Sequence, residues 1–569
     1  MTPARLVVLL LLPACAPDSA LVAPSSRSPA RVLEPGCAGS PYATIQAAID
    51  DAVDLDVIDV CPGVYHERLS IVGKELTLRA RDGALTATID AQTFGRALDV
   101  SAGATVTVDG LELVNGLDAT SGGVIQCTDA TLDVTAARIA DGVSGVGGGL
   151  SMSNCSGTIA DTLFEGNSGW SGGGVHVTGG GTVTLTGLEL RGNDADFQGG
   201  GIYTDGDVDI IDCLFDANHS YYGGGAYANA SYAEMSGGTY TNNTSDNDGG
   251  GLYVFAGAPL VSANYFEAND SSDEGGALRL KLSTGVVDDN TFVNNHADYR
   301  GGAIKVSHEA ITMDRNTYIG NSAWVYGGAL FMKESASVLT GDQFEGNTAQ
   351  YGGAVSIDTG WGPLTIQDAS FRDNHATDNG GHLHLHQPGQ NLRLVRLDLE
   401  GGTADVGGAV YAYDSQILLR NVRAHNNDAS VSGGAVYVDA TATTVTNSVF
   451  WRNTSPVGSA LHVYDGVGAD VVNSVFGLNT TGAAIEVASG TVPAVSYSVF
   501  HDNTADVLGM TDPIGVDGNK SGAPRFRNPG RGNFHLKANS KLIDLGDPSL
   551  SDPDGSRSDI GAYGGPDAH

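Results

Sequence analysis

A short motif that begins with two glycines recurs along most of this chain and constrains its fold more than any other feature. Residues 301–306 read GGAIKV, and the same pattern begins 26 residues earlier at Gly275 and 26 residues later at Gly327. Self-similarity with a period of about 20–50 residues is typical of solenoids, propellers and arrays. Because each unit of a solenoid contacts only its neighbours, 569 residues do not imply several globular domains.

Fifteen copies of this motif can be aligned, with steps of 24 to 28 residues. They begin at Gly122, Gly147, Gly172, Gly199, Gly223, Gly249, Gly275, Gly301, Gly327, Gly352, Gly380, Gly407, Gly433, Gly458 and Gly482. Thirteen copies have the second glycine, whereas Ser459 and Ala483 take its place in the last two. A small residue follows most of the glycine pairs, and aliphatic residues then alternate with variable ones. This alternation predicts a β-strand with one buried face.

An aromatic-x-x-Asn motif precedes most of these copies. Its aromatic residues are Phe164, Phe215, Tyr240, Phe266, Phe292, Tyr318, Phe344, Phe371, Phe450, Phe476 and Phe500. In a parallel β-helix, coils repeat every ~4.8 Å, so equivalent aromatic rings stack inside the helix and equivalent asparagines form a ladder. The paired glycines are expected to supply the positive φ of a sharp corner. We therefore predict an all-β parallel β-helix, with about 17 coils between residues 60 and 510.

The segment before the first coil predicts an end cap. Ile45, Ala48 and Ile49 fall at helical spacing behind Thr44, a candidate N-cap, and strands with a Pro62-Gly63 turn follow. This arrangement resembles the entry to right-handed parallel β-helix proteins of the pectate-lyase-like superfamily, in which an amphipathic helix covers the open end. The resemblance implies a right-handed β-helix over residues 37–510.

The two repeated motifs also resemble the repeats of chlamydial polymorphic outer-membrane proteins, which are β-helical adhesins. The resemblance covers roughly residues 120–505. Those proteins end in a membrane β-barrel, for which this sequence shows no counterpart. The shared repeat supports the fold, and it implies adhesion only by analogy.

The N-terminus predicts export. Residues 1–14 contain Arg5 and a short apolar run, as in a signal peptide, and Leu12-Pro13-Ala14-Cys15 resembles a bacterial lipobox. The resemblance implies lipidation of Cys15, followed by a flexible tether within residues 15–36, although an ordinary signal peptide with an incidental cysteine is the alternative. We expect an outer-membrane-anchored lipoprotein or an extracellular protein, with membrane contact only through the lipid.

Export permits disulfide bonds. Cys37 and Cys61 flank one compact segment, whereas Cys127 and Cys155 lie 28 residues apart, about one repeat. We predict that each of these pairs is bridged. Cys213 is left without a partner and is expected to be a small buried residue.

The period ends after Asn503, and residues 511–569 are expected to form a terminal coil and a cap that closes the far end. They look like the tail of secreted bacterial right-handed β-helix proteins. Asp552, Asp554 and Asp559 suggest an oxygen-rich loop for Ca²⁺, the one candidate cofactor. The alternative is a turn held by Asx hydrogen bonds.

The variable position after each glycine pair is expected to form one solvent-facing column. Its candidate ligand-binding residues are Tyr203, Tyr227, Tyr253, Arg279, Lys305, Phe331, Tyr411 and Tyr437. Exposed aromatic rings could stack on sugar rings, and the basic pair could bind uronic carboxylates. The alternative is that Tyr is simply a favourable strand residue.

Two further motifs have structural and chemical interpretations. His382, His384 and His386 are expected on one outward face of a strand. They could bind a metal ion, but we favour no specific binding, because no carboxylate partner is evident. Gly63–Glu67 resembles a turn of pectin methylesterases, whose catalytic Asp motifs are not evident elsewhere. We therefore interpret it as a structural corner, and assign no catalytic residue.

The formal charge of −37 argues against nucleic acid as a partner. The function that we expect is a non-enzymatic binding or adhesion protein for glycans or cell surfaces, acting as a monomer. A polysaccharide lyase or glycoside hydrolase that acts on acidic polysaccharide at the Tyr253–Phe331 region is one alternative. A structural envelope protein is another.

Overall fold

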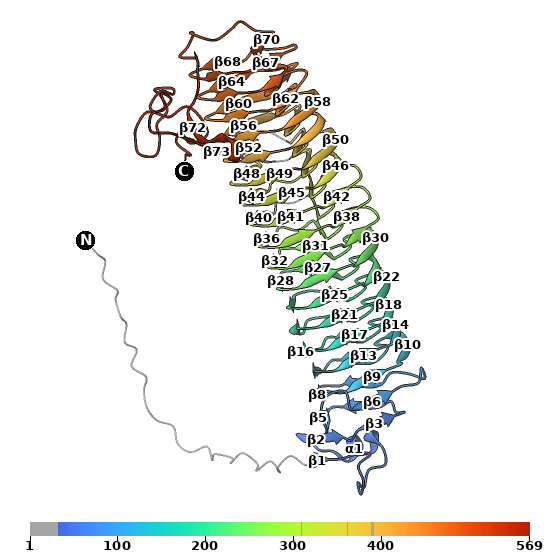
Figure 1. Ribbon diagram of the computed structural model, residues 1–569. Helices are drawn as coiled ribbons and strands as arrows, with labels where there is room; N and C mark the ends of the chain where they lie inside the picture. Colours follow the sequence, from blue (N-terminus) through green and yellow to red (C-terminus); the bar gives the residue numbers. More distant parts are fainter. Residues whose placement is uncertain (1–31, 309, 361, 389–391, 569) are drawn as a thin grey trace, which may run out of the picture.

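The chain forms a right-handed parallel β-helix, as predicted (Figure 1). A computed structural model describes residues 32–308, 310–360, 362–388 and 392–568. Four parallel sheets run along the solenoid, and within these residues the sheet that follows the glycine pairs has 18 strands, one per coil. The predicted signal peptide and lipidation site at Cys15 lie outside the described residues.

One coil illustrates the path of the chain. It consists of β35 (Leu278–Lys281), β36 (Val286–Asp288), β37 (Thr291–Val293) and β38 (His296–Ala297), which belong to four different sheets, here called sheets 1 to 4. The next coil repeats them as β39 (Ile304–Ser307), β40 (Thr312–Asp314), β41 (Thr317–Ile319) and β42 (Ser322–Ala323). The pairing is in register, so equivalent residues of successive coils lie directly above one another.

The aromatic stack is confirmed inside the solenoid. Phe266, Phe292 and Tyr318 are fully buried, and their rings follow one another at 4.9 and 5.1 Å between centroids. The stack continues in both directions, with spacings of 4.4 Å for Phe215–Tyr240 and 4.5 Å for Tyr318–Phe344. Parallel rings that repeat with the coil therefore form much of the core.

The asparagine ladder is also confirmed. The side chain of Asn295 donates to the oxygen of Asn321 at 3.0 Å and to the carbonyl of Phe266 at 3.0 Å, and its own oxygen accepts from the backbone N–H of Asn269. These side chains are buried, so each hydrogen bond replaces one that water would make outside.

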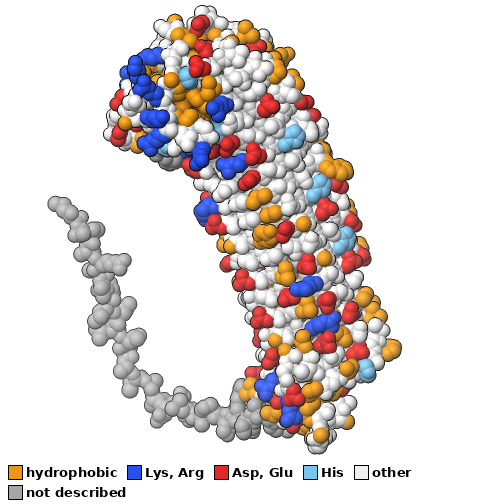
Figure 2. Space-filling view, in the orientation of Figure 1, with side chains coloured by type: hydrophobic (Ala, Val, Ile, Leu, Met, Phe, Trp, Pro, Cys, Tyr) orange, Lys and Arg blue, Asp and Glu red, His pale blue; other side chains and the backbone are white. Residues whose placement is uncertain are grey.

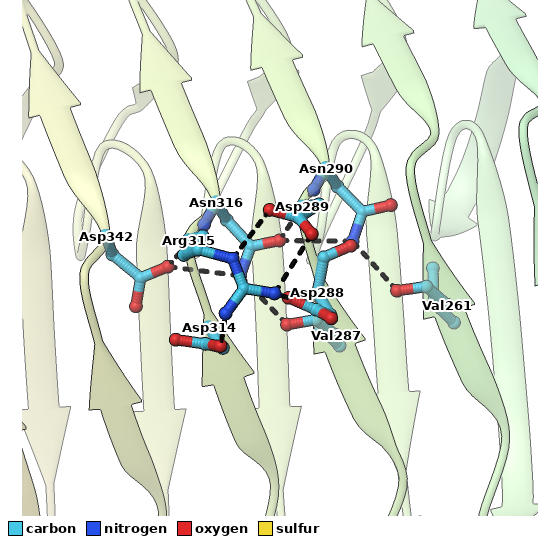
Figure 3. Close-up of polar contacts among 9 residues, drawn as sticks. All are labelled: Val261, Val287, Asp288, Asp289, Asn290, Asp314, Arg315, Asn316 and Asp342. Carbon is cyan, nitrogen blue, oxygen red and sulfur yellow. Dashed lines mark hydrogen bonds and ion pairs between the residues drawn. The ribbon is translucent and has the colours of Figure 1, made fainter.

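A second ladder, which was not predicted from the sequence, follows the corner between sheets 2 and 3 (Figure 3). Asn264, Asn290 and Asn316 form it, and Asp342 ends it by accepting from Asn316 at 2.8 and 3.1 Å. On the outer side of this corner, Arg315 is held by several carboxylates, which are those of Asp288, Asp289 and Asp314.

The glycine pair has two different roles, and this corrects the expectation that both glycines supply positive φ. Gly301 has φ +65°, whereas Gly302 does not have positive φ. A Cβ on Gly302 would lie 2.2 Å from the carbonyl oxygen of Gly328 and 2.3 Å from that of Ser322. The second glycine is therefore needed because neighbouring backbones approach it closely.

The predicted helix forms at the N-terminal end of the solenoid (Figure 1). Helix α1 (Ile45–Asp51) begins after Thr44, whose hydroxyl accepts from the Ala47 N–H, and it buries Ile45, Ala48 and Ile49. The carboxylate of Glu67 accepts from the first two amides of the helix at 3.0 Å each. The Gly63–Glu67 segment is therefore structural, but its first part forms strand β3 (Gly63–Tyr65) of sheet 3 rather than a corner. The first strand, β1 (Val32–Leu33), begins inside the predicted tether.

The cysteines behave as expected. Disulfide bonds join Cys37 to Cys61 and Cys127 to Cys155. Cys213 is buried, and burial raises the pKa of its thiol to about 12. In the described part of the chain, no helix has the length and apolar character needed to cross a membrane.

The C-terminal segment differs from the prediction, because it does not simply close the far end. After β70 (Ala505–Leu508) and β71 (Lys520–Ser521), the chain folds back along the side of the solenoid (Figure 1). Phe526 and Phe534 pack with Trp451, Val475 and Val499 from sheet 3. Residues 558–565 hydrogen-bond with Asn421, Asn447 and Asn473. We call residues 522–568 the clasp.

Candidate functional site

The predicted column does line up on sheet 1, but it lies at the bottom of a concave corner rather than on an open surface. Strand pairing places Tyr253, Arg279, Lys305 and Phe331 at equivalent positions of successive coils. Their exposed fractions are only 3%, 3%, 1% and 1%. The expectation of a fully solvent-facing column is therefore wrong, and we call this column the floor.

The residues that precede each glycine pair cover the floor, and we call them the wall. They include Tyr222, Asp248, Glu274, Arg300, Tyr326, Tyr351 and Asn379, which pair from coil to coil. The ring of Tyr222 lies 5.5 Å from that of Tyr253, and the ring of Tyr326 lies 5.6 Å from that of Phe331. Floor and wall together form a groove along the junction of sheets 1 and 4.

Charged side chains fill the middle of the groove. Arg279 lies 3.4 Å from Asp248 and 3.4 Å from Glu274, and the carboxylate of Glu274 also pairs with Arg300 at 3.2 Å and with Lys305 at 3.9 Å. The ammonium of Lys305 lies 4.2 Å from the centre of the Phe331 ring. These groups therefore neutralise one another inside the protein.

Burial controls the protonation of this cluster. It lowers the pKa of Lys305 to about 7, although the Glu274 carboxylate opposes the change. It raises the pKa of Asp248 to about 6, against the effect of Arg279. With its side chain only 2% exposed, Lys305 cannot contact a polysaccharide without movement of the wall. The cluster is thus a sealed part of the groove.

The groove opens on the C-terminal side of this cluster into a cavity of about 450 Å³. The cavity is lined by Tyr326, Tyr351, Asp358, Asn379, His384, His386, Tyr411 and Tyr413. The wall supplies two stacked rings, Tyr326 and Tyr351, at 5.1 Å between centroids. Sheet 1 supplies the remaining rings from β51 (Leu383–His386) and β55 (Val410–Tyr413).

A small residue in the floor explains why the cavity exists. Ser356 occupies the position between Phe331 and His384, so the aromatic floor is interrupted there. One face of His384 is stacked on Tyr411, at 5.4 Å between centroids, and the other face is turned toward the coil of Ser356. The hydroxyl of Ser356 hydrogen-bonds with Nδ1 of His384 at 3.1 Å.

The polar groups of the cavity are fixed by their neighbours. Nδ1 of His386 lies 2.9 Å from a carboxylate oxygen of Asp358, and its ring stacks on Tyr413 at 5.4 Å. Burial lowers the pKa of His384 to about 3, so this imidazole is neutral at physiological pH. The cavity therefore combines rigid aromatic surfaces with a few oriented hydrogen-bonding groups, as in small-molecule sites.

The other predicted aromatic residues form two separate stacks along the floor. Tyr203, Tyr227 and Tyr253 stack at 5.7 and 4.9 Å between centroids, and only Tyr203 is partly exposed, since Tyr227 and Tyr253 are buried. Tyr411 and Tyr437 stack at 5.4 Å and continue the floor beyond the cavity. Of the eight predicted residues, Arg279, Lys305 and Phe331 thus form a buried cluster in the middle. The five tyrosines form two runs, one on each side of this cluster.

The predicted histidine face is only partly formed. His382 is fully buried, with Nδ1 3.1 Å from the amide of Asn374, because the chain turns inward at this corner. It lies beside Gly402, which stands where the ladder would otherwise have an asparagine. His384 and His386 alone reach the cavity.

The predicted Ca²⁺ loop is a set of turn caps instead. Asp552 accepts from the amides of Asp559 and Gly565, Asp554 accepts from Ser556, and Asp559 accepts from the amide of Asp544. Among the described residues, no group of three His, Cys, Asp or Glu side chains is placed to hold a metal ion. This outcome corresponds to the Asx-turn alternative.

The wall residues were not identified from the sequence. Tyr326 and Tyr351 stand directly before Gly327 and Gly352, a position that varies from Asp to Arg to Tyr along the repeats. Variation at a position directly before the repeated glycines could have indicated a functional surface. Strand alternation did not reveal it, because alternation does not show that these residues lie over the floor.

Comparison with known proteins shows similarity in fold. A model of right-handed beta helix regions matches residues 173–349. Similar solved structures include YbhC of Escherichia coli, at 13% identity over 46% of this chain and 78% of that one, with a TM-score of 0.27. The PL6 family alginate lyase AlyGC has 10% identity over 86% of this chain and 99% of that one, with a TM-score of 0.24.

PfbA, a surface adhesin of Streptococcus pneumoniae, has 9% identity over 75% of this chain and 88% of that one, with a TM-score of 0.16. No curated protein sequence matches the chain.

Proposed function

We propose that this chain is an exported β-helix protein that binds a saccharide in the cavity between Tyr326 and Tyr413. The observation that carries the proposal is the lining of that cavity, which has a volume of about 450 Å³. Its rings offer apolar surfaces for the C–H faces of a sugar, and Asp358, Asn379 and His386 offer hydrogen bonds to hydroxyl groups. The two disulfide bonds support an oxidising, extracytoplasmic location.

Adhesion to a glycan-bearing surface is the role that fits this site. A rigid solenoid holds the cavity in one geometry, so binding costs little conformational entropy. Anchoring through a lipid on Cys15 is part of the proposal, and incorporation of labelled palmitate into the full chain and a Cys15→Ala variant tests it. Label in the full chain that is absent from the variant supports the anchor, and no label in the full chain contradicts it.

A polysaccharide-cleaving enzyme is the second candidate, and the pair formed by His386 and Asp358 favours it. A carboxylate that orients an imidazole beside a cavity is an arrangement that general-base catalysis uses. The sealed contacts of Arg279 and Lys305 give no support to the Tyr253–Phe331 region as its active site. New reducing ends or unsaturated products from acidic polysaccharides, lost in His386→Ala, would establish the enzyme.

Replacing Tyr351 with Ala should weaken saccharide binding by roughly tenfold or more, because it removes one of the two wall rings. A glycan array identifies a ligand for the full chain, and isothermal titration calorimetry then compares the variant with it. Tyr265→Ala is the matched control, since this tyrosine is 36% exposed on the outside of sheet 3. Equal affinity of Tyr351→Ala and the parent chain, or no glycan binding at all, would contradict the proposal.

A further inference from the structure

A cationic segment stands out in this acidic chain. Between Asp517 and Asp544 the sequence has no Asp or Glu, whereas the whole chain has 66 acidic and 29 Lys and Arg residues. The same stretch contains Lys520, Arg525, Arg527, Arg531, Lys537 and Lys541, all of them exposed. Figure 2 shows Lys and Arg side chains gathered over the clasp, in contrast to the mixed surface of the solenoid. We call these six residues the cationic patch.

A hairpin of the clasp organises this patch. Strands β72 (Phe526–Asn528) and β73 (Asn533–Leu536) pair in antiparallel fashion, and Phe526 and Phe534 point into the core beneath. Because side chains alternate along a strand, Arg527 points away from that core, and Arg525, directly before the strand, is also exposed. Arg531 lies at the tip of the hairpin, in the short helix η1 (Pro529–Arg531). The hairpin thus carries Arg527 and Arg531, and the other cations of the patch lie in the segments before and after it.

These cations lack internal counter-charges. Among the residues that the structure describes, none of the six takes part in an ion pair, and Arg525 donates only to the carbonyl of Asn539, at 3.3 Å. Arginines of the solenoid behave differently, since Arg138 pairs with Glu112 and Glu165 at 2.7 and 2.9 Å. Unpaired like charges repel, so an anionic partner would lower the free energy of this surface.

The surroundings of the patch restrict the partner. Phe526 and Phe534 are 4% and 1% exposed, so neither phenylalanine ring of the hairpin is available to stack on the bases of a single-stranded nucleic acid. A lipid bilayer is also a poor match, because insertion requires exposed apolar side chains. Near the patch, the large apolar side chain of Ile543 is exposed at only 37%. Cations spread over a hairpin and the following turn match a chain of anionic groups better than one small anion.

We propose that the cationic patch binds an acidic polysaccharide, whose repeated carboxylate or sulfate groups pair with its guanidinium and ammonium groups. Arginine forms two parallel hydrogen bonds to a carboxylate, which suits it to this ligand. The acidic solenoid repels the same polymer, but salt screens that repulsion beyond ~8–10 Å. This site is separate from the cavity and does not depend on saccharide binding there.

The test compares the full chain with the variant Arg525→Gln, Arg527→Gln, Arg531→Gln. Polygalacturonate and heparin are the probes, dextran is the neutral control, and binding is measured at 50 and 200 mM salt. The variant should lose at least roughly tenfold in affinity. For about four ionic contacts, the fourfold rise in salt should weaken binding by the parent chain by roughly 50- to 150-fold.

Matched variants separate this site from total charge and from the cavity. Arg68→Gln, Arg191→Gln, Arg372→Gln makes the same change in charge at exposed positions of the solenoid, and should bind like the parent chain, as should Tyr351→Ala. Loss of binding in this control triple, or equal binding by the patch variant, would overturn the proposal. So would absence of polyanion binding at 50 mM salt, or stronger binding to duplex DNA or to phosphatidylserine vesicles than to either polysaccharide.

Discussion

Replacing Asp342 with Asn is expected to stabilise the protein at pH 8 by roughly 2–4 kcal/mol. Asp342 is fully buried at the end of the second asparagine ladder, and one of its carboxylate oxygens has no hydrogen-bond partner. Burial raises the pKa of this carboxyl from 3.8 to about 7, against the hydrogen bonds from Asn316. The folded protein therefore favours the protonated acid.

The pattern of the ladder explains why an amide should suit this position better than a carboxylate. Asn290 and Asn316 each donate to the carbonyl of the residue 29 positions earlier, which are Val261 and Val287 (Figure 3). By the same spacing, we expect the free oxygen of Asp342 to face the carbonyl of Met313. Two acceptors repel each other, whereas an amide N–H₂, or a protonated acid, can donate there.

The sign of the pH dependence follows from the raised pKa. Between pH 4 and 7 the folded parent chain binds more protons at Asp342 than the unfolded chain, so the stability of the parent falls as the pH rises. The advantage of Asp342→Asn should be small near pH 4, grow by about 1.4 kcal/mol per pH unit, and level off above pH 7. Urea denaturation at pH 5, 6, 7 and 8 measures it.

Asp270→Asn is the matched control for this experiment. Asp270 is an exposed strand residue that directly follows Asn269 of the first asparagine ladder. It should change the free energy of unfolding by no more than ~0.5 kcal/mol at every pH. An advantage of Asp342→Asn that does not vary with pH, or a loss of stability at pH 8, would show that the buried carboxyl is not protonated in the folded protein.

The features of the fold that repeat in each coil could be predicted from the sequence. The interior position of Phe292 and the ladder position of Asn295 follow from spacing alone, because stacked coils place equivalent residues together. The second ladder follows the same rule, and Asn264, Asn290 and Asn316 recur at the coil spacing. It was missed because an asparagine between two strands also reads as an ordinary turn residue.

Features that depend on contacts between distant segments could not be predicted in this way. The clasp packs on Val475 and Val499, which stand at outward positions where Thr291 and Thr317 stand in earlier coils. Apolar residues at an outward position indicate a cover, but the period does not say which segment supplies it. The contact joins residues separated by more than a hundred positions, such as Asn421 and Gly564.

The candidate site shows the same limit. Strand alternation correctly placed His384 and Tyr411 in one column. It could not show that Tyr326 and Tyr351 lean over that column, because the angle between sheets 1 and 4 is a property of the whole coil. A residue that points away from the core is therefore not always exposed, and Lys305, at 1% exposure, is the clearest case.

Replacing Gly302 with Ala is expected to cause a large loss in the free energy of unfolding, although it adds only one methyl group. Its Cβ would lie 2.2 Å from the carbonyl oxygen of Gly328, and both this oxygen and that of Ser322 belong to the backbone, so neither can rotate away. Relief of the clash requires the two coils to separate, which breaks the sheet pairing on both sides. We expect a cost of more than about 4 kcal/mol, or failure to accumulate as folded protein.

Gly346→Ala separates this steric effect from the conformational one, because Gly346 has φ +64° and no atom lies within 4 Å of its added Cβ. An L-residue in that conformation costs about 1 kcal/mol, so this control should fold and unfold at slightly lower urea concentration. Urea denaturation and expression yield of the two variants decide the matter. If Gly302→Ala were no less stable than Gly346→Ala, close approach of the coils would not be the reason for the second glycine, and the positive φ of the first would account for the motif alone.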